Sequence, residues 1–514
     1  MSDRRTIPDL LAATEGEALG TPGRPSLDRA GLRAQVERTA RALAGLGLAP
    51  GDAVAIVLPN GPEMASAFLG VASCATAAPL NPAYTESEFR FYMDDLGAKA
   101  VLLADGAETP ARAAAAALGV RVLEARVAEG DPAGVFALAE GGEPVAAGEA
   151  RWNGPEDVAL VLHTSGTTSR PKIVPLTARN LCASAESIAA TLDLSPRDRC
   201  LNIMPLFHIH GLLAALLASM AAGASVVCTP GFDALRFFRW LEEAGPTWWT
   251  AVPTMHQAIL ARAARNADAV AAARPRFIRS SSASLPVPTL RGLEETFGCP
   301  VIEAYGMTEA SHQMASNPLP PKARKPGSVG IAAGPEVAVM GEGGRLLPAG
   351  ETGEIVIRGE SVTGGYARNP EANAGAFRDG WFRTGDQGSM DADGYLTISG
   401  RLKEIINRGG EKVAPKEVDD ALVEHPAVAQ AVTFALPHRS LGEEVAAAIV
   451  LKEGAEATAR ELRDFAAQRL AAFKVPREFV FLDEIPKGAT GKLQRIGLAE
   501  KLGLGQGASQ RAGS

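Results

Sequence analysis

Cysteine is scarce in this chain, with five residues among 514, and the sequence contains no Cys-x-x-Cys pair. A disulfide framework needs a higher density of cysteine than this, so none is expected. We therefore predict buried thiols in a protein of a reducing compartment. The cysteines stand far apart, at Cys74, Cys182, Cys200, Cys228 and Cys299.

An excess of positive charge is also missing. The chain has 51 Lys plus Arg against 59 Asp plus Glu, which gives a formal charge of −8. Binding to nucleic acid or to an anionic membrane surface is therefore not expected. If the ligands are anions, local and well-aimed donors must hold them.

No apolar run is long enough to span a bilayer. The longest one, from Leu212 to Cys228, is interrupted by Ser219, Gly223 and Ser225, and it is shorter than the roughly 20 residues that a spanning helix needs. It predicts a buried helix that leads into a strand. The amino-terminal stretch carries acidic residues early and lacks a continuous apolar core, so a secretory signal is not expected and we predict a cytoplasmic protein.

The spacing of apolar residues predicts an α/β fold. Residues 27–46 have helical spacing and lead through a turn into the strand-like residues 53–60, and residues 64–78 again predict a helix. This alternation is typical of largely parallel sheets covered by helices. After about Val337, short alternating runs between Gly-rich turns predict an antiparallel or barrel-like subdomain. A second change in composition predicts a domain boundary at 400–403.

A loop rich in hydroxyl groups follows the strand-like residues 158–162. It runs His163-Thr-Ser-Gly-Thr-Thr-Ser-Arg-Pro-Lys172, and its backbone N–H groups, hydroxyls and cations suit phosphate oxygens. It is not a Walker loop, because Gly166 is not followed by Gly-Lys-Ser/Thr at the required offset, and no G-x-G-x-x-G opens a dinucleotide-binding unit. A triphosphate cradle and a purely structural turn both fit these residues.

Two further segments combine polar groups near strand-like runs. Residues 205–211 place His208 and His210 two positions apart, where both would point the same way on an extended segment. Without a third ligand nearby, a packed or pocket-lining pair is the alternative to a metal site. Residues 304–309 offer an aromatic ring, a hydroxyl and a carboxylate, which suit a base, a phosphate and Mg²⁺. An ordinary strand-to-loop junction also fits them.

Three segments nearer the carboxyl terminus display charged groups. Residues 381–386 and 400–404 each put one beside a Gly turn, where it would bind ribose hydroxyls or simply face solvent. Residues 486–495 form a loop that presents several cations, among them Lys492.

Six segments, taken in order, resemble the signature series of the adenylate-forming acyl-CoA synthetases: HTSGTTSRPK, PLFHIHG, EAYGMTE, WFRTGD, GRLKEIINRGGEKVAP and PKGATGKLQR. The resemblance spans nearly the whole chain, and SSASLP and EAYGMTEASHQMASNPLP look most like the oxalyl-CoA synthetase branch, relatives of the 4-coumarate–CoA ligases. It implies an AMP-binding adenylation domain over 1–400, β-rich at about 337–400, and a small mobile α+β domain over 401–514. It also implies that MgATP converts an acid to an acyl-adenylate and that CoA then displaces AMP.

The resemblance gives roles to individual residues. Tyr305 would stack on adenine, Thr308 would contact the α-phosphate and Glu309 would ligate Mg²⁺. Asp386 and Arg401 would bind ribose hydroxyls. The loop that holds the β- and γ-phosphates matches Thr164, Ser165, Gly166, Thr167, Thr168 and Lys172.

The carboxyl-terminal matches concern the change between two half-reactions. Lys492 matches the lysine that bridges the attacking carboxylate and the phosphate oxygens. Lys403 falls at the hinge, and Gly409 and Gly410 would let the backbone lie along the pantetheine arm of CoA.

Two residues of the phosphate loop depart from the broad family pattern. Ser169 stands where many members have Gly, although the oxalyl branch also carries Ser, and Ile173 follows Lys172 where Gly is usual. Because a β-branched residue resists positive φ, we expect a stiffer exit from the loop.

The branch predicts oxalate as the acid. Its second carboxylate would need donors in a short pocket, since an unpaired buried charge is expensive. Ala304 would shorten the cavity. The residues that match the acyl pocket or lie near it are His208, His210, Ser282, Ser284, His312 and Asn317.

Other functions remain open at this point. The same ligase would act on malonate, a medium-chain fatty acid or an aryl acid, or an adenylating enzyme would load a separate carrier protein. A nucleotide-binding regulator without turnover is a further class, against which Lys492, Glu309 and Asp386 argue. The expected partners are small molecules, and the expected assembly is a monomer or a homodimer.

Overall fold

The computed structural model describes residues 5–13, 15–164, 171–486, 493 and 495–504. The chain forms two compact units, which are described separately. The larger unit comprises Met1–Leu285, Thr289–Val337 and Ile357–Phe382. The smaller unit comprises Pro286–Pro288, Ala338–Val356 and Arg383–Ser514. The boundary predicted at 400–403 lies within the smaller unit and stays a prediction.

The first sheet of the larger unit has the strand order β10-β9-β4-β3-β5-β6-β7-β8. Its centre is parallel, since β3 pairs in parallel with β4 and β5, and β4 with β9. The antiparallel pair β9 and β10 closes one edge. The strands are β3 (Ala53–Val57), β4 (Thr76–Pro79), β5 (Ala100–Ala104), β6 (Arg121–Arg126), β7 (Ala137–Glu140), β8 (Glu143–Pro144), β9 (Val158–Thr164) and β10 (Lys172–Thr177).

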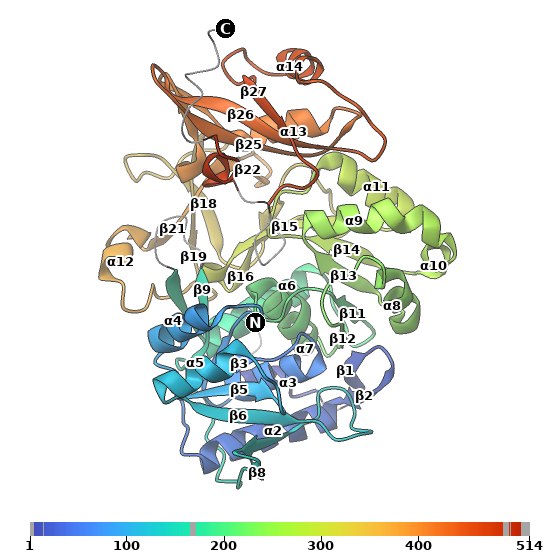
Figure 1. Cartoon of the computed structure of the whole chain (residues 1–514), viewed down its shortest axis with the longest axis vertical. Helices are drawn as coiled ribbons and strands as arrows, with labels where there is room; N and C mark the ends of the chain where they lie inside the picture. Colours follow the sequence, from blue (N-terminus) through green and yellow to red (C-terminus); the bar gives the residue numbers. More distant parts are fainter. Residues whose placement is uncertain (1–4, 14, 165–170, 487–492, 494, 505–514) are drawn as a thin grey trace. The chain divides into compact units, whose positions relative to one another are not determined.

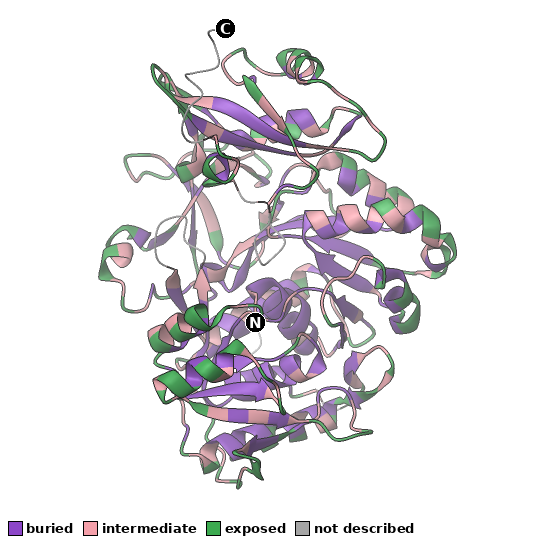
Figure 2. Cartoon of the chain, viewed as in Figure 1, coloured by how far each residue is buried: buried purple, intermediate pink, exposed green. Residues whose placement is uncertain are grey.

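The second sheet of the larger unit has the order β17-β16-β15-β14-β13-β11-β12-β1-β2. Its central strands are buried, as the purple ribbons of Figure 2 show. The strands are β1 (Glu17–Thr21), β2 (Arg24–Asp28), β11 (Arg199–Asn202), β12 (Ser225–Cys228), β13 (Trp248–Ala251), β14 (Phe277–Ser280), β15 (Val301–Met307), β16 (His312–Ser316) and β17 (Ile331–Ala332).

Helices pack on these sheets (Figure 1). Their apolar side chains contribute to the buried core. One core places Ile259 of α9 and Leu293 of α11 against Trp249 of β13 and Ile278 of β14. The helices are α1 (Ile7–Leu10), α2 (Arg29–Gly45), α3 (Pro62–Ala72), α4 (Glu86–Leu96), α5 (Pro110–Leu118), α6 (Ala178–Thr191), α7 (Ala218–Ala221), α8 (Phe237–Ala244), α9 (Pro253–Ala263), α10 (Ala267–Ala272), α11 (Val287–Phe297) and α12 (Pro370–Ala376), with a π-helix at His210–Leu217 and 3₁₀ turns at Ala264–Asn266 and Thr308–Ala310.

Local sequence explains where individual helices begin and end. At the start of α4, the Thr85 side chain accepts from the backbone N–H of Glu88, and the Glu88 carboxylate accepts from that of Thr85. This reciprocal cap satisfies two donors that the helix leaves open. Gly97 ends the helix at φ 62°, a left-handed conformation that glycine adopts without steric penalty.

The smaller unit contains a sheet of order β24-β23-β26-β25 with β27 beside β26. A further sheet has the order β18-β19-β21-β20, with β22 beside β21. The strands are β18 (Glu336–Met340), β19 (Thr352–Arg358), β20 (Phe377–Arg378), β21 (Trp381–Met390), β22 (Leu396–Arg401), β23 (Ile406–Arg408), β24 (Glu411–Val413), β25 (Val428–His438), β26 (Gly442–Leu451) and β27 (Glu478–Phe481), and the helices are α13 (Pro415–Val423), α14 (Ala459–Ala467), α15 (Leu498–Lys501) and a 3₁₀ turn at Leu402–Glu404.

The predicted α/β class is confirmed, with parallel sheets in the larger unit and a smaller carboxyl-terminal unit. The apolar run 212–228 forms a helical stretch followed by β12, as expected. The helix predicted over residues 64–78 is wrong at its end, because α3 stops at Ala72 and Thr76–Pro79 is strand β4. Pairing of β4 with both β3 and β9 outweighs the helix propensity of its alanines.

Two further expectations concern burial and membranes. All five cysteines are buried free thiols, as predicted. Within the described ranges, no helix combines the length and the apolar character that crossing a bilayer requires.

Candidate active site

Tyr305, Thr308 and Glu309 lie at the end of one strand. Ala304 and Tyr305 belong to β15, and Thr308 and Glu309 form the 3₁₀ turn that follows it. Strand β16 returns antiparallel, with Tyr305 opposite Ala315. Glu309 is 6% exposed and Tyr305 is 8% exposed. The end of β15 and the turn after it therefore hold an aromatic ring and a largely buried carboxylate within five residues.

Glu309 is linked to the end of the predicted phosphate loop through Tyr366. The Tyr366 hydroxyl donates to Glu309 Oε1 at 2.9 Å, and the ammonium of Lys172 lies 4.3 Å from the centroid of the Tyr366 ring. The backbone N–H of Thr363 donates to the carbonyl of Glu309 at 2.8 Å. The structure thus brings Lys172 and Glu309 to the same aromatic ring.

The two ends of the predicted phosphate loop face each other across an antiparallel pair. Lys172, the first residue of β10, stands opposite Thr164, the last of β9. The predicted residues Ser165, Gly166, Thr167 and Thr168 lie outside the described residues, as does Ser169.

Ile173 does not have positive φ, the conformation that a β-branched residue resists. It lies within β10 opposite His163 and is 6% exposed. An extended, buried position suits a β-branched side chain. The ring of His163 is fixed in turn, since its Nε2 lies 3.1 Å from Asp95 Oδ2.

A compact polar cluster occupies the region predicted to line the acyl pocket. His210 Nδ1 lies 3.0 Å from Ser282 Oγ, and the rings of His210 and His312 stack with centroids 4.9 Å apart. His210 is 0% exposed and His312 1%. Ser282 and His312 both have positive φ, 74° and 89°, and such strained residues tend to gather at functional sites.

Arg279, which sequence reasoning missed, lies beneath this cluster. It sits on β14 and is 0% exposed. Its Nη1 lies 3.3 Å from His312 Nε2 and 3.5 Å from His210 Nε2. Burial lowers the pKa of Arg279 to about 9, which leaves it protonated at neutral pH. A lone arginine inside the apolar strand Phe277–Ser280 is the sequence signal for it.

The segment that carries His208 and His210 is not extended. A turn precedes His210, which begins the π-helix, and the backbone N–H of His210 donates to His208 Nδ1 at 3.3 Å. Within the described ranges, no group of three or more His, Cys, Asp or Glu side chains is placed to hold a metal ion. The pocket-lining role of this histidine pair stays a prediction.

The remaining predicted pocket residues have different surroundings. Ala304 is buried in β15, and Ser284 is exposed. Asn317 Nδ2 donates to the Ser328 carbonyl at 2.7 Å, and its Oδ1 accepts from the Lys325 N–H at 3.0 Å, so this side chain ties a loop together. Their contact with an acid stays a prediction.

In the smaller unit, Asp386 and Arg401 face each other across β21 and β22. Arg401 Nε lies 3.1 Å from Asp386 Oδ1, with side-chain exposures of 50% and 7%. The ion pair holds the carboxylate in one orientation, as binding of two adjacent hydroxyls would require. Its role toward ribose stays a prediction.

The predicted CoA residues form a tight turn. Gly409 and Gly410, with φ of 60° and 96°, join β23 to β24. Positive φ at both positions matches the hairpin turns that favour glycine. Lys403 is exposed on the 3₁₀ turn Leu402–Glu404.

Lys492 lies outside the described residues. Arg495, three positions later, is held by Asp419 at 2.7 Å and by Glu404, next to the predicted hinge, at 3.1 Å.

The paired sheets, the turn with Tyr305 and Glu309, and the phosphate-loop ends define an adenylate-forming enzyme, and comparison with known proteins agrees. The AMP-binding enzyme family matches residues 18–367, and the AMP-binding enzyme C-terminal domain matches residues 417–492. The chain belongs to the AMP-binding enzyme family, among its acyl-CoA synthetases.

Similar proteins cover nearly the full chain. An oxalate–CoA ligase of Arabidopsis thaliana is 46% identical over 93% of this chain and 94% of that protein. A sulfoacetate–CoA ligase of Cupriavidus necator is 38% identical over 96% of this chain and 94% of that protein. The structure of ATP-bound MatB from Rhodopseudomonas palustris is 30% identical, with a TM-score of 0.86 over 97% of this chain and 99% of that one.

Proposed function

We propose that this protein is an ATP-dependent acid–thiol ligase that converts oxalate to oxalyl-CoA, with release of AMP and pyrophosphate. The observation that carries the choice of acid is the polar cluster of His210, Ser282 and His312, with the buried Arg279 behind it. Two similar proteins are named for oxalate and sulfoacetate, acids that each carry a second anionic group.

In the first half-reaction a carboxylate oxygen attacks the α-phosphorus of ATP, and the bond to the bridging oxygen of pyrophosphate breaks. Thr164, Lys172 and the loop between them hold the β- and γ-phosphates. Tyr305 stacks on adenine and Thr308 contacts the α-phosphate. Lys492 bridges the carboxylate and the phosphate oxygens, where it stabilises charge that grows in the transition state.

Glu309 fits a Mg²⁺ site of the kind that uses few protein ligands. Mg²⁺ is commonly held by one or two carboxylates together with substrate phosphates and water. Glu309 is nearly buried and is oriented by Tyr366, whose ring also lies against Lys172. When bound, the ion would neutralise charge on the phosphate oxygens, and Glu309 would fix its position.

In the second half-reaction the CoA sulfur attacks the acyl carbon, the bond to AMP breaks, and the thiol proton is lost to solvent. One carbon must first meet a phosphate and later a thiol, so rotation of the small domain about Lys403 provides the second arrangement. The exposed turn at Gly409 and Gly410 then lies along the pantetheine arm.

Donors rather than apolar walls favour a small dianionic acid over a medium-chain fatty acid or an aryl acid. Burying an unpaired carboxylate costs several kcal/mol, so a site for oxalate must contain hydrogen-bond donors. The imidazole of His312 and the hydroxyl of Ser282 are donors of this kind, and His210 lies behind Ser282 with its Nδ1 3.0 Å from Ser282 Oγ.

Reduced thiols support a cytoplasmic setting. Burial raises the pKa of Cys74 and of Cys228 to about 12, so these thiols resist ionisation and oxidation. The partners are small molecules, and a monomer or a homodimer remains the expected assembly.

The test is pyrophosphate release and thioester formation with oxalate, malonate, acetate, octanoate and coumarate, each with and without CoA. Oxalate should give the highest kcat/KM, and the thioester should appear only with CoA. A preference for octanoate or coumarate would reject oxalate while leaving the ligase intact. Transfer to a carrier protein but not to CoA would favour the carrier-loading alternative.

A further inference from the structure

Arg279 is a buried cation whose hydrogen-bond acceptors are neutral. Nη2 donates to Gln313 Oε1 at 3.1 Å, and Nη1 reaches Thr250 Oγ1 at 3.3 Å as well as the two histidines. Nε has no hydrogen-bond partner. Among the described residues, no Asp or Glu forms an ion pair with this guanidinium. A buried charge without a counter-ion is strongly unfavourable unless an anion arrives to pair with it.

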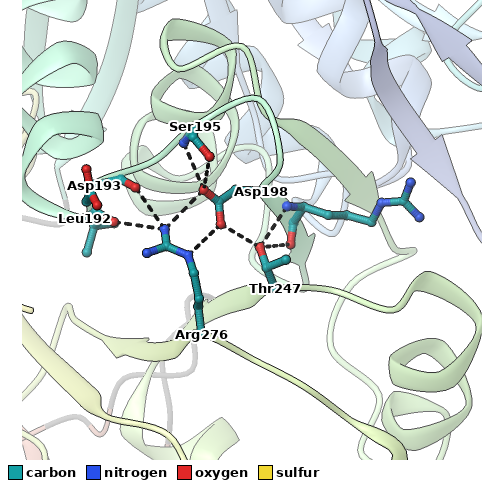
Figure 3. Close-up of polar contacts among 7 residues, drawn as sticks. Leu192, Asp193, Ser195, Asp198, Thr247 and Arg276 are labelled. Atoms are coloured by element: carbon teal, nitrogen blue, oxygen red, sulfur yellow. Dashed lines mark hydrogen bonds and ion pairs between the residues drawn. The ribbon is translucent and has the colours of Figure 1, made fainter.

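Arg276, three positions earlier, shows how the same strand region treats an arginine with a structural role. Figure 3 shows its guanidinium against the Asp198 carboxylate, with Nε to Oδ1 at 2.9 Å and Nη2 to Oδ2 at 3.1 Å. Nη2 also donates to the carbonyls of Leu192 and Asp193, where helix α6 ends. Arg276 has a carboxylate partner, whereas Arg279 has none within the part of the chain that the structure describes, so charge neutralisation separates the two arginines.

The contacts of Arg279 fix the direction of the hydrogen bonds toward the pocket. Because Arg donates only, Thr250 Oγ1 accepts from it and turns its own proton to His210 Nε2, 2.6 Å away. With Nε2 an acceptor, a neutral His210 carries its proton on Nδ1 and donates to Ser282 Oγ. The Ser282 hydroxyl proton is then directed away from His210.

His312 follows the same rule. Its Nε2 accepts from Arg279 Nη1, so a neutral ring carries the proton on Nδ1. A Cβ placed on Gly306 would lie 3.0 Å from that Nδ1, which locates it beside the strand that contains Tyr305. Ser282 is partly exposed while His210, His312 and Arg279 are buried, so the cluster reaches the surface at Ser282.

We propose that Arg279 is the positioning residue that makes the acyl pocket select acids with a second negative charge. It holds His210 as the donor to Ser282, keeps the proton of His312 on Nδ1, and supplies positive charge that the second anionic group of the acid neutralises. The inference rests on the proposed function for the reaction itself. It adds the residue that sets the charge class of the acid.

The test compares oxalate with oxamate, in which a neutral amide replaces the second carboxylate. The kcat/KM of pyrophosphate release is measured for both acids. The wild type should prefer oxalate by about 10- to 100-fold, the range expected for hydrogen bonds to a charged group. Arg279→Met has a side chain of similar length without charge. It should bring the ratio of kcat/KM for oxalate to that for oxamate close to one, mainly by lowering kcat/KM for oxalate. Arg279→Lys should retain a preference for oxalate.

Arg276→Met is the matched control. It should lower the melting temperature and leave the oxalate-to-oxamate ratio unchanged, because its charge is already neutralised by Asp198. If Arg279→Met lowers kcat/KM for oxalate and for oxamate by the same factor, so that their ratio is unchanged, Arg279 has a structural role and the inference is overturned. If Arg279→Met does not fold, Thr250→Val breaks the link to His210 and should lower the ratio about threefold to tenfold. An unchanged ratio would count against the inference.

Failure of the proposed acid is a separate outcome. If the wild type uses malonate and not oxalate, the proposed substrate is wrong, and malonate against malonamate tests Arg279 in the same way. If the wild type prefers neutral or apolar acids such as octanoate, the role of Arg279 in charge selection is overturned as well.

Discussion

The Tyr366 hydroxyl donates a hydrogen bond of 2.9 Å to Glu309 Oε1, although the two residues are 57 positions apart in the sequence. Glu309 is the carboxylate assigned to Mg²⁺, and the same tyrosine ring contacts Lys172. One side chain therefore orients groups assigned to both the metal and the phosphates.

Tyr366→Phe removes the hydroxyl and keeps the ring beneath Lys172. We expect kcat/KM for MgATP to fall about 10- to 100-fold, since hydrogen bonds to charged groups contribute about 1.5–3 kcal/mol. The Mg²⁺ concentration for half-maximal rate should rise. Tyr366→Leu, which also removes the ring, should lower kcat/KM for MgATP further. If Phe and Leu give the same defect without a shift in Mg²⁺ dependence, the hydroxyl does not orient Glu309.

The pairing of Asp386 with Arg401 leads to a second prediction. Asp386→Ala should lower kcat/KM for ATP about 10- to 100-fold by removing a charged acceptor for ribose hydroxyls. The same variant should lose much less kcat/KM with the 2′-deoxy or 3′-deoxy nucleotide that lacks the hydroxyl bound by Asp386. Arg383→Ala, which breaks an ion pair between Arg383 of β21 and Glu354 of β19, is the control and should change kcat/KM little for ATP and for the deoxynucleotides. If Asp386→Ala lowers kcat/KM equally for ATP and for both deoxynucleotides, Asp386 does not bind the ribose directly.

The candidate site residues that the sequence groups together are those that are contiguous along the chain. Tyr305, Thr308 and Glu309 lie within five residues, so one motif contains them. The sequence did not predict a role for Tyr366, because this residue follows two glycines in an irregular segment. It contacts Glu309 only in the folded chain, 57 positions away in the sequence. The sequence did not predict a role for Arg279, because the presence of one arginine in a four-residue strand does not indicate whether a carboxylate lies next to it. The helix predicted through Ala78 was wrong because strand pairing on both sides of β4 is a long-range effect.

Lys492 gives a prediction that separates the two half-reactions. Lys492→Ala should lower adenylation by about 3–4 kcal/mol or more in transition-state stabilisation, measured by pyrophosphate release. Thioester formation from preformed acyl-adenylate and CoA should be nearly normal. Lys452→Ala, an exposed lysine of the same unit, should affect neither step. Loss of both steps to the same extent would contradict the division of roles between the two arrangements.

Acid stability should depend on His256, which is 0% exposed beneath Arg279. Its Nε2 donates to the Arg279 carbonyl at 3.2 Å, and its Nδ1 has no hydrogen-bond partner. Burial lowers the pKa of His256 to about 4, although the bond to that carbonyl opposes the shift. The unfolded chain therefore binds this proton near pH 6.5, before the folded protein does. The contribution of neutral His256 to the free energy of unfolding is complete above about pH 6.5 and is lost as the pH falls toward 4.

Between pH 7 and pH 5, the free energy of unfolding should fall by about 2 kcal/mol through His256 alone. Urea unfolding at both pH values measures the change. His256→Gln cannot titrate, so its own loss between these pH values should be smaller than that of the wild type by about this amount, even if it is less stable at pH 7. His438→Gln, at an exposed position, should keep the wild-type difference. An equal pH dependence in His256→Gln and the wild type would mean that His256 is protonated in the folded protein as readily as in the unfolded chain.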